Sequence, residues 1–126
     1  MAEPVVKTYQ DFRPEFEAML EPAKWPIKWL DEQIALGTAV AFCADDACII
    51  ASLRRYPGGA IEVHGLCACG DLSAIKTLIV QAEEWGMQNG ASIATISSRR
   101  GWVRALSPEG YAETQVMIEK GLNRGA

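Results

Sequence analysis

Glu62 and His64 are two positions apart in an apolar stretch that is typical of a strand. Side chains two positions apart on a strand point to the same face of the sheet, so this carboxylate and this imidazole would lie together. Imidazole titrates near neutral pH and can exchange a proton with a reacting group. Glu62 and His64 are therefore a candidate catalytic pair, and the alternative is the polar face of a half-exposed strand.

The cysteines could hold a metal ion or pack as apolar side chains. The chain contains Cys43, Cys48, Cys67 and Cys69. Cys67, Cys69 and His64 suggest zinc, but structural zinc sites favour cysteines spaced by two to four residues together with a second, distant ligand pair. His64 is the single histidine of the chain. Cys43 and Cys48 flank a predicted turn and could lie opposite each other, which leaves a four-thiol set open, but we expect core thiols and no metal.

The one basic cluster of the chain could bind a phosphate group or an acidic partner. It consists of Arg99, Arg100 and Arg104, interleaved with Trp102. Arg100 and Arg104 would share one face of a helix, arginine binds phosphate through two nitrogens, and tryptophan can stack on a base or on adenine. The alternative is a solvated face with Trp102 turned to the core.

Length and composition limit the classes of protein to consider. The chain has 126 residues, of which 49% are apolar and 22% are charged. These values predict one globular domain over residues 1–126 and exclude intrinsic disorder. The net charge of -4 argues against a general nucleic-acid binder, which would carry a basic excess.

The sequence gives no sign of secretion or of membrane insertion. Glu3 and Pro4 lie where a secretory signal would have a basic region and then a long apolar run. The longest apolar stretches, 38–44 and 47–53, are too short to cross a bilayer. We therefore expect a cytoplasmic protein with reduced thiols.

Apolar spacing and turn residues predict the elements that must position these side chains. The expected helices are 11–20 with Asp11 as N-cap, 27–36 ending at Gly37, 71–89 and 99–106. The expected strands are 5–9, 38–44, 47–55, 60–66, 91–97 and 111–119. A small-residue loop over 67–70 would lead into the longest helix. This order predicts an α/β fold with a mixed sheet and helices on both faces.

This order of elements, over residues 38–122, resembles the GNAT superfamily of N-acetyltransferases. The stretch from Ser98 to Leu106, together with the pair Gly110-Tyr111, is similar to short GNAT-related proteins of bacteriophages and prophages. The resemblance implies acetyl-coenzyme A as cofactor if the protein is active, and an amine as acceptor. It also implies that Glu62 or His64 is the base. The implied cofactor-binding segment is Leu66, Cys67, Ala68, Cys69 and Gly70.

The sequence departs from the family pattern at two places. Active members carry an Arg/Gln-x-x-Gly-x-Gly/Ala loop that holds the cofactor diphosphate, whereas the segment from Cys67 to Ser73 is shorter and has one glycine. Asp71 would place a carboxylate at the start of the following helix, where it caps the helix and repels phosphate. Leu106 stands where many members have a tyrosine that acts as general acid.

Together these features predict a GNAT-like protein of phage or prophage type whose acetyl-coenzyme A motif is eroded. We expect a binding or virion-assembly component with a protein partner, in the host cytoplasm or in the virion. One alternative is an acetyl-coenzyme A-dependent N-acetyltransferase. Another is a host-interaction module that uses residues 99–104. Neither a nucleic acid nor a membrane is an expected partner.

Overall fold

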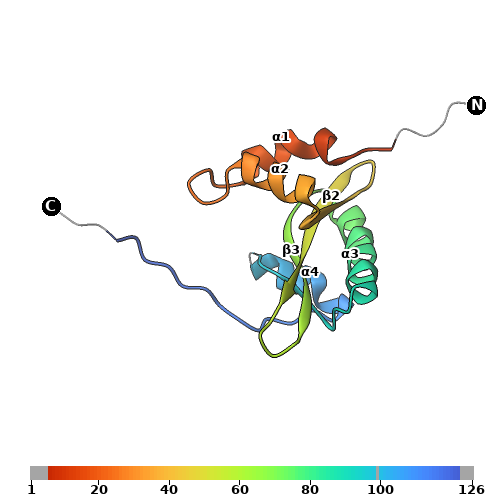
Figure 1. Ribbon diagram of the computed structural model, residues 1–126, viewed down its shortest axis with the longest axis vertical. Helices are drawn as coiled ribbons and strands as arrows, with labels where there is room; N and C mark the ends of the chain where they lie inside the picture. Colours follow the sequence, from red (N-terminus) through yellow and green to blue (C-terminus); the bar gives the residue numbers. More distant parts are fainter. Residues whose placement is uncertain (1–5, 99, 123–126) are drawn as a thin grey trace, which may run out of the picture.

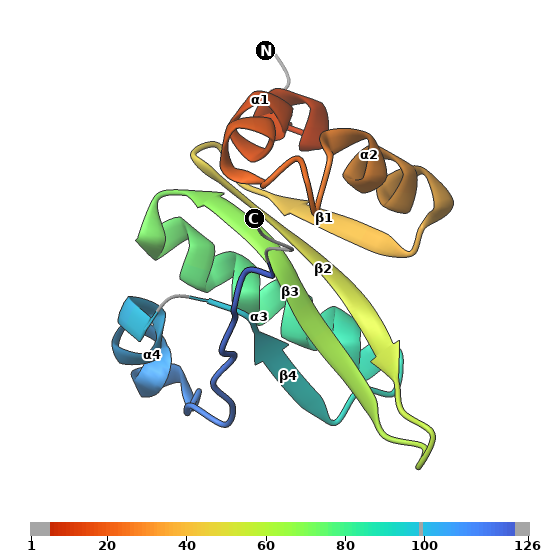
Figure 2. The same ribbon diagram turned by 90° about the vertical axis from the view of Figure 1, so that its left-hand side faces the viewer.

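The computed structural model describes residues 6–98 and 100–122, with the backbone alone at Arg100. Its four-stranded sheet has the order β1 (Ala39–Cys43), β2 (Ala47–Arg55), β3 (Ile61–Gly70) and β4 (Ile93–Ile96). The first three strands form an antiparallel meander, and β4 pairs with β3 in parallel. The predicted mixed sheet is therefore confirmed (Figure 2).

Helices cover both faces of the sheet. α1 (Tyr9–Met19) and α2 (Ile27–Leu36) pack on one face, and α3 (Leu72–Gln88) packs on the other, where it connects β3 to β4 (Figures 1 and 2). The alternation of β2 explains both cores, because Ile49 faces α3 while Cys48 and Ile50 face α1 and α2. α4 (Arg100–Leu106) and a short 3-10 turn (Ser107–Glu109) follow β4.

The N-terminal strand prediction is wrong. Residues 6–8 form no strand, α1 already begins at Tyr9, and Val5 lies outside the described residues. Asp11 is not the N-cap, since Thr8 holds that position and its backbone N–H donates to Asp11 Oδ2 at 2.8 Å. Asp11 thus satisfies a backbone donor ahead of the helix from its first turn. By contrast, α2 has the predicted bounds and ends at Gly37, whose φ is +77°.

The predicted loop over 67–70 is instead the second half of β3. Cys67 pairs with Ile50 and Gly70 pairs with Ala47. The register shifts between Ile50 and Ala51 of β2, which leaves Leu66 as the extra residue on β3. Gly70 has φ +107°, and a Cβ there would lie 2.2 Å from the carbonyl oxygen of Asp46. Glycine is therefore required where β3 reaches the turn between β1 and β2.

The prediction of a last strand over 111–119 is also wrong. The chain after the 3-10 turn has no regular secondary structure as far as it is described, up to Leu122. Met117 and Ile118 are 85% and 91% exposed. Within the described residues no strand pairs with the outer edge of β4, so this segment has no partner that would make it a strand. No helix in the described part of the chain is long and apolar enough to span a membrane.

Candidate functional site

The two parallel strands separate halfway along β3. Their pairing runs from Glu62 opposite Ile93 to Gly65 opposite Ile96. β3 then continues beside β2 to Gly70, whereas β4 ends at Ile96 and the chain turns toward α4. The strands are thus held together at one end and apart at the other.

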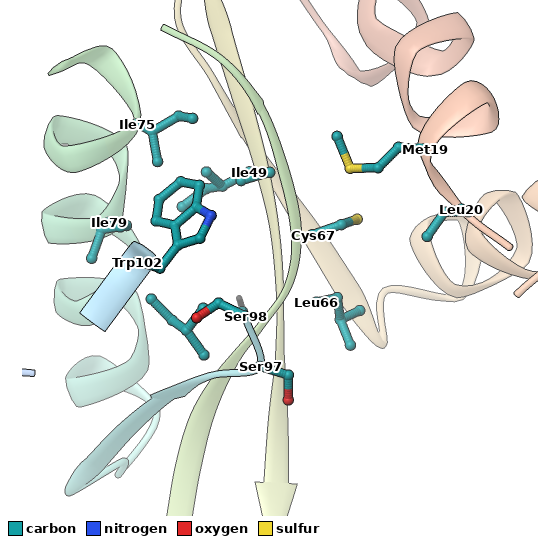
Figure 3. A pocket seen from close by; sticks show the side chains of 13 residues that line it. Met19, Leu20, Ile49, Leu66, Cys67, Ile75, Ile79, Ser97, Ser98 and Trp102 are labelled. Atoms are coloured by element: carbon teal, nitrogen blue, oxygen red, sulfur yellow. The ribbon is translucent and has the colours of Figure 1, made fainter. Parts of the chain in front are cut away.

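A mainly apolar cavity of about 470 Å³ lies where the strands part. Its walls include Leu66 and Cys67 from β3, Ile75 and Ile79 from α3, and Trp102 from α4 (Figure 3). We call this space the strand cleft. The residues that line it carry no charged side chain, so an uncharged group suits it better than a charged one.

Trp102 is half-buried and packs against the core beneath α3. Its ring lies between α3 and β3 in the strand cleft (Figure 3). Trp102 thus turns toward the core, as the alternative interpretation expected, and its possible contact with a ligand stays a prediction. Arg104 is exposed on α4. Arg99 lies outside the described residues, and the side chain of Arg100 is not described, so the proposed basic patch stays a prediction at both positions.

A second, larger cavity of about 810 Å³ lies between β4, α4 and residues 111–117. We call it the groove. It contains both predicted catalytic residues, Glu62 and His64, and it shares Ile96, Ser97, Ser98 and Trp102 with the strand cleft. The predicted pair therefore lies next to the point where the strands separate.

Thr95 on β4 joins the predicted pair through hydrogen bonds. Its hydroxyl donates to Glu62 Oε2 at 2.7 Å and lies 2.8 Å from Nδ1 of His64. Because the single hydroxyl proton goes to Glu62, Thr95 must accept from His64, so Nδ1 carries the imidazole proton. Nε2 of His64 then keeps a lone pair and can accept a proton.

Both members of the pair are buried, and each has a shifted pKa. Burial alone would raise the pKa of Glu62, but hydrogen bonds from Thr95 and from Tyr56 (2.8 Å), with Arg54 at 3.5 Å, outweigh it and lower that pKa. Burial, followed by Arg54, lowers the pKa of His64, and Glu62 offsets this in part. The pair is therefore a carboxylate and a neutral imidazole near neutral pH.

Sequence reasoning missed Thr95 and Tyr56. Tyr56 belongs to the turn after β2, and Thr95 is 31 residues from His64 in the sequence. The register of β4 against β3 depends on the length of the α3 crossover, and no local pattern indicates that register. The one signal available in the sequence was Thr95 itself, a polar residue between apolar neighbours on the strand predicted over 91–97.

The predicted cofactor segment does not form a diphosphate-binding loop. Leu66 to Gly70 lie within β3, where the last four residues pair with β2 on one side and the pairing with β4 has already ended at Gly65. The α3 N-terminus is also capped, because the Asp71 carboxylate accepts from the Ala74 N–H at 3.1 Å. The Asp71 N–H in turn donates to the carbonyl of Asp46 at 3.0 Å. The Asp71 carboxylate therefore occupies the helix end at which a diphosphate would need positive partial charge, and it is unfavourable for a bound anion there.

Other predicted positions lie in packed surroundings. Leu106 is buried in the core, 3% exposed. Tyr111, after the 3-10 turn, donates its hydroxyl to Glu83 of α3. Cys43 and Cys48 lie opposite each other on β1 and β2, as predicted, with 3.2 Å between their sulfurs. Within the described residues, no three His, Cys, Asp or Glu side chains are grouped to hold a metal ion.

Several solved structures of acetyltransferases have a similar fold. The chain superposes on a predicted acetyltransferase from Clostridium acetobutylicum, solved with acetyl-CoA, with a TM-score of 0.68 and 8% identity over 88% of this chain and 86% of that one. An aminoglycoside 6'-N-acetyltransferase from Acinetobacter haemolyticus gives 0.65 and 16% identity over 98% of both chains. An acetyltransferase from Trypanosoma brucei gives 0.64 and 12% identity over 90% of both chains.

No family model matches the sequence, and no curated protein matches it. The fold and the parted strands define an α/β protein with a GNAT-like fold. The chain therefore shares its architecture with acetyltransferases, at identities that carry the fold alone.

Proposed function

We propose that this protein is a GNAT-like binding component, of phage or prophage type, rather than a working acetyltransferase. The observation that supports this most is the capped N-terminus of α3. Asp71 satisfies the Ala74 N–H and adds a carboxylate where a GNAT resemblance implies the cofactor diphosphate. The phage context rests on the similarity of residues 98–106 and of Gly110-Tyr111 to short phage proteins.

The groove is the surface we assign to a protein partner. It is bordered by α4, which carries the exposed Arg104, and by the segment in which Val116 and Met117 are 61% and 85% exposed. Aromatic, methionine and arginine side chains are enriched where proteins associate. A tagged full-length chain should retain a protein that the Arg100→Glu/Arg104→Glu variant does not, at an unchanged unfolding midpoint. Equal capture by both proteins would argue against this surface.

The acetyltransferase alternative is supported by one observation, the buried pair of Glu62 and His64 joined through Thr95. In that case His64 Nε2 would take up the proton of a bound amine, directly or through water, and Glu62 would orient the imidazole through Thr95.

An activity assay separates the two functions. The protein is incubated with acetyl-CoA and a panel of primary amines, and free coenzyme A is detected by mass spectrometry, which protein thiols do not disturb. We expect the rate to equal that of buffer. Turnover tenfold or more above buffer that is lost in both His64→Gln and Glu62→Gln would establish the acetyltransferase instead.

A further inference from the structure

Cys43 and Cys48 form a close thiol pair at the tip of the β1–β2 hairpin. Their sulfurs lie 3.2 Å apart, and both side chains face the core under α1 and α2. The pair lies on the sheet face opposite α3. It is no part of the groove or of the strand cleft.

The backbone register at this tip suits a cross-strand bond. The Ala44 N–H donates to the Ala47 carbonyl at 2.8 Å, so 44 and 47 form the hydrogen-bonded pair that closes the hairpin. By alternation, Cys43 and Cys48 form the next, non-hydrogen-bonded pair, in which the Cα atoms approach to about 4.5 Å. Disulfides have Cα separations from about 4.4 Å and an S–S length of about 2.05 Å, so closure needs sulfur movement of about 1 Å and no change of register.

The two thiols differ in access, which sets the order of reaction. Cys48 is fully buried, and burial followed by its contact with Cys43 raises its pKa. Cys43 is half-buried and reaches the surface beside the turn. Cys43 is therefore the thiol that an oxidant meets first, and Cys48 is the thiol that resolves the product.

We propose that Cys43 and Cys48 are a redox-active pair that closes to a disulfide in the presence of a small hydroperoxide. Cys43 attacks the peroxide, becomes a sulfenic acid and releases an alcohol, or water from hydrogen peroxide. The Cys48 sulfur then displaces the sulfenic hydroxyl as water and forms the S–S bond. Two thiols lose two electrons and two protons, and one peroxide is reduced. The closed bond would fix the turn whose Asp46 carbonyl holds the Asp71 N–H ahead of α3.

Cys69 is the internal competitor, because it pairs with Cys48 across β2 and β3. Cys67 lies one position beyond the bulge, opposite Ile50. Both thiols have pKa values raised by burial, which slows their own oxidation. These two cysteines supply the matched control.

The test treats the purified full-length chain with hydrogen peroxide and counts thiols after denaturation. We expect the free thiols to fall from four to two, peptide mass spectrometry to show Cys43 linked to Cys48, and dithiothreitol to restore all four. The Cys67→Ser/Cys69→Ser variant should form the same link, and Cys43→Ser should form none.

Three outcomes would overturn the proposal. They are a Cys48–Cys69 link, a link between two chains, and accumulation of Cys43 sulfinic acid without any link. The Cys43→Ala/Cys48→Ala variant is the folding control. An unfolding transition at the wild-type midpoint shows that it is folded, so that a missing link reflects the missing thiols and not a lost fold.

Discussion

The carboxylate of Asp71 accepts a hydrogen bond of 3.1 Å from the backbone N–H of Ala74, in the first turn of α3. Asp71 is the single residue between β3, which ends at Gly70, and α3, which begins at Leu72. Its carboxylate places a negative charge at the positive end of the helix dipole. The same end of α3 is where the GNAT resemblance implies an anionic ligand. The Asp71 cap therefore stabilises this helix end and would compete with an anion for it.

Replacing the cap should weaken the fold by a modest, specific amount. We expect Asp71→Ala to lower the free energy of unfolding by about 1 kcal/mol, because the Ala74 N–H loses its partner. Asp71→Ser keeps an N-cap oxygen and should stay close to the wild type. Urea denaturation of the three proteins measures this, and equal losses for alanine and serine would show that the cap contributes nothing.

The buried imidazole of His64 should make stability depend on pH. Burial, followed by Arg54, holds its pKa below the ordinary 6.5, with Glu62 offsetting part of the shift. Below about pH 6.5 the unfolded chain takes up a proton that the folded protein resists, so the free energy of unfolding falls by up to about 1.4 kcal/mol per pH unit. The loss stops once the pH is below the folded-state pKa.

The control for this pH dependence is a variant that cannot titrate there. In His64→Gln the urea concentration at the unfolding midpoint should change less between about pH 7 and about pH 5 than it does in the wild type. Glu62, whose pKa is lowered from 4.5, loses its contribution only as the pH falls below that value, so it leaves this interval unchanged. An identical slope in wild type and His64→Gln would assign the dependence to other groups.

Two helical glycines should respond to alanine with opposite signs. A Cβ at Gly86 of α3 would lie 2.7 Å from Cβ of Val63, so Gly86→Ala should destabilise by about 1–3 kcal/mol. Nothing lies within 4 Å of a Cβ at Gly101 of α4, so Gly101→Ala should stabilise by about 0.5–1 kcal/mol.

The double variant Gly86→Ala/Val63→Ala isolates the packing contact between α3 and β3. We expect it to be more stable than the sum of its single changes predicts, because Val63→Ala removes the two γ carbons that a Cβ at Gly86 would meet at 2.8 and 3.3 Å, and that Cβ fills part of the space they leave. Chemical denaturation of all variants measures the coupling, and strict additivity would exclude the close approach of α3 to β3 as its cause.

The sequence predicted best those helices and strands that begin and end at a proline or a glycine. α2 has its predicted bounds because Pro26 precedes it and Gly37 follows it with φ +77°. The end of β3 was missed because Cys67 to Gly70 are small residues typical of a loop, and their pairing with β2 is a long-range property. For residues 111–119 the pattern was typical of a strand, but a pattern cannot supply a partner strand.

The candidate site was predicted in part for the same reason. Period-two alternation placed Glu62 and His64 on one face of one strand, and the structure buries both there. Thr95, which joins them, comes from a strand whose register is set by the crossover helix. The Asp71 cap was predicted from residue type and position alone, and the structure confirms it.

The central claim is that this protein is a binding component and does not use acetyl-CoA, and a measurement of acetyl-CoA binding tests it most directly. Thermal unfolding of the full chain is followed with and without millimolar acetyl-CoA, alongside Asp71→Ser. We expect no shift of the wild-type midpoint, because the Asp71 carboxylate at the N-terminus of α3 would repel the diphosphate. A saturable rise equivalent to about 2.7 kcal/mol at a hundredfold excess over the dissociation constant would contradict it.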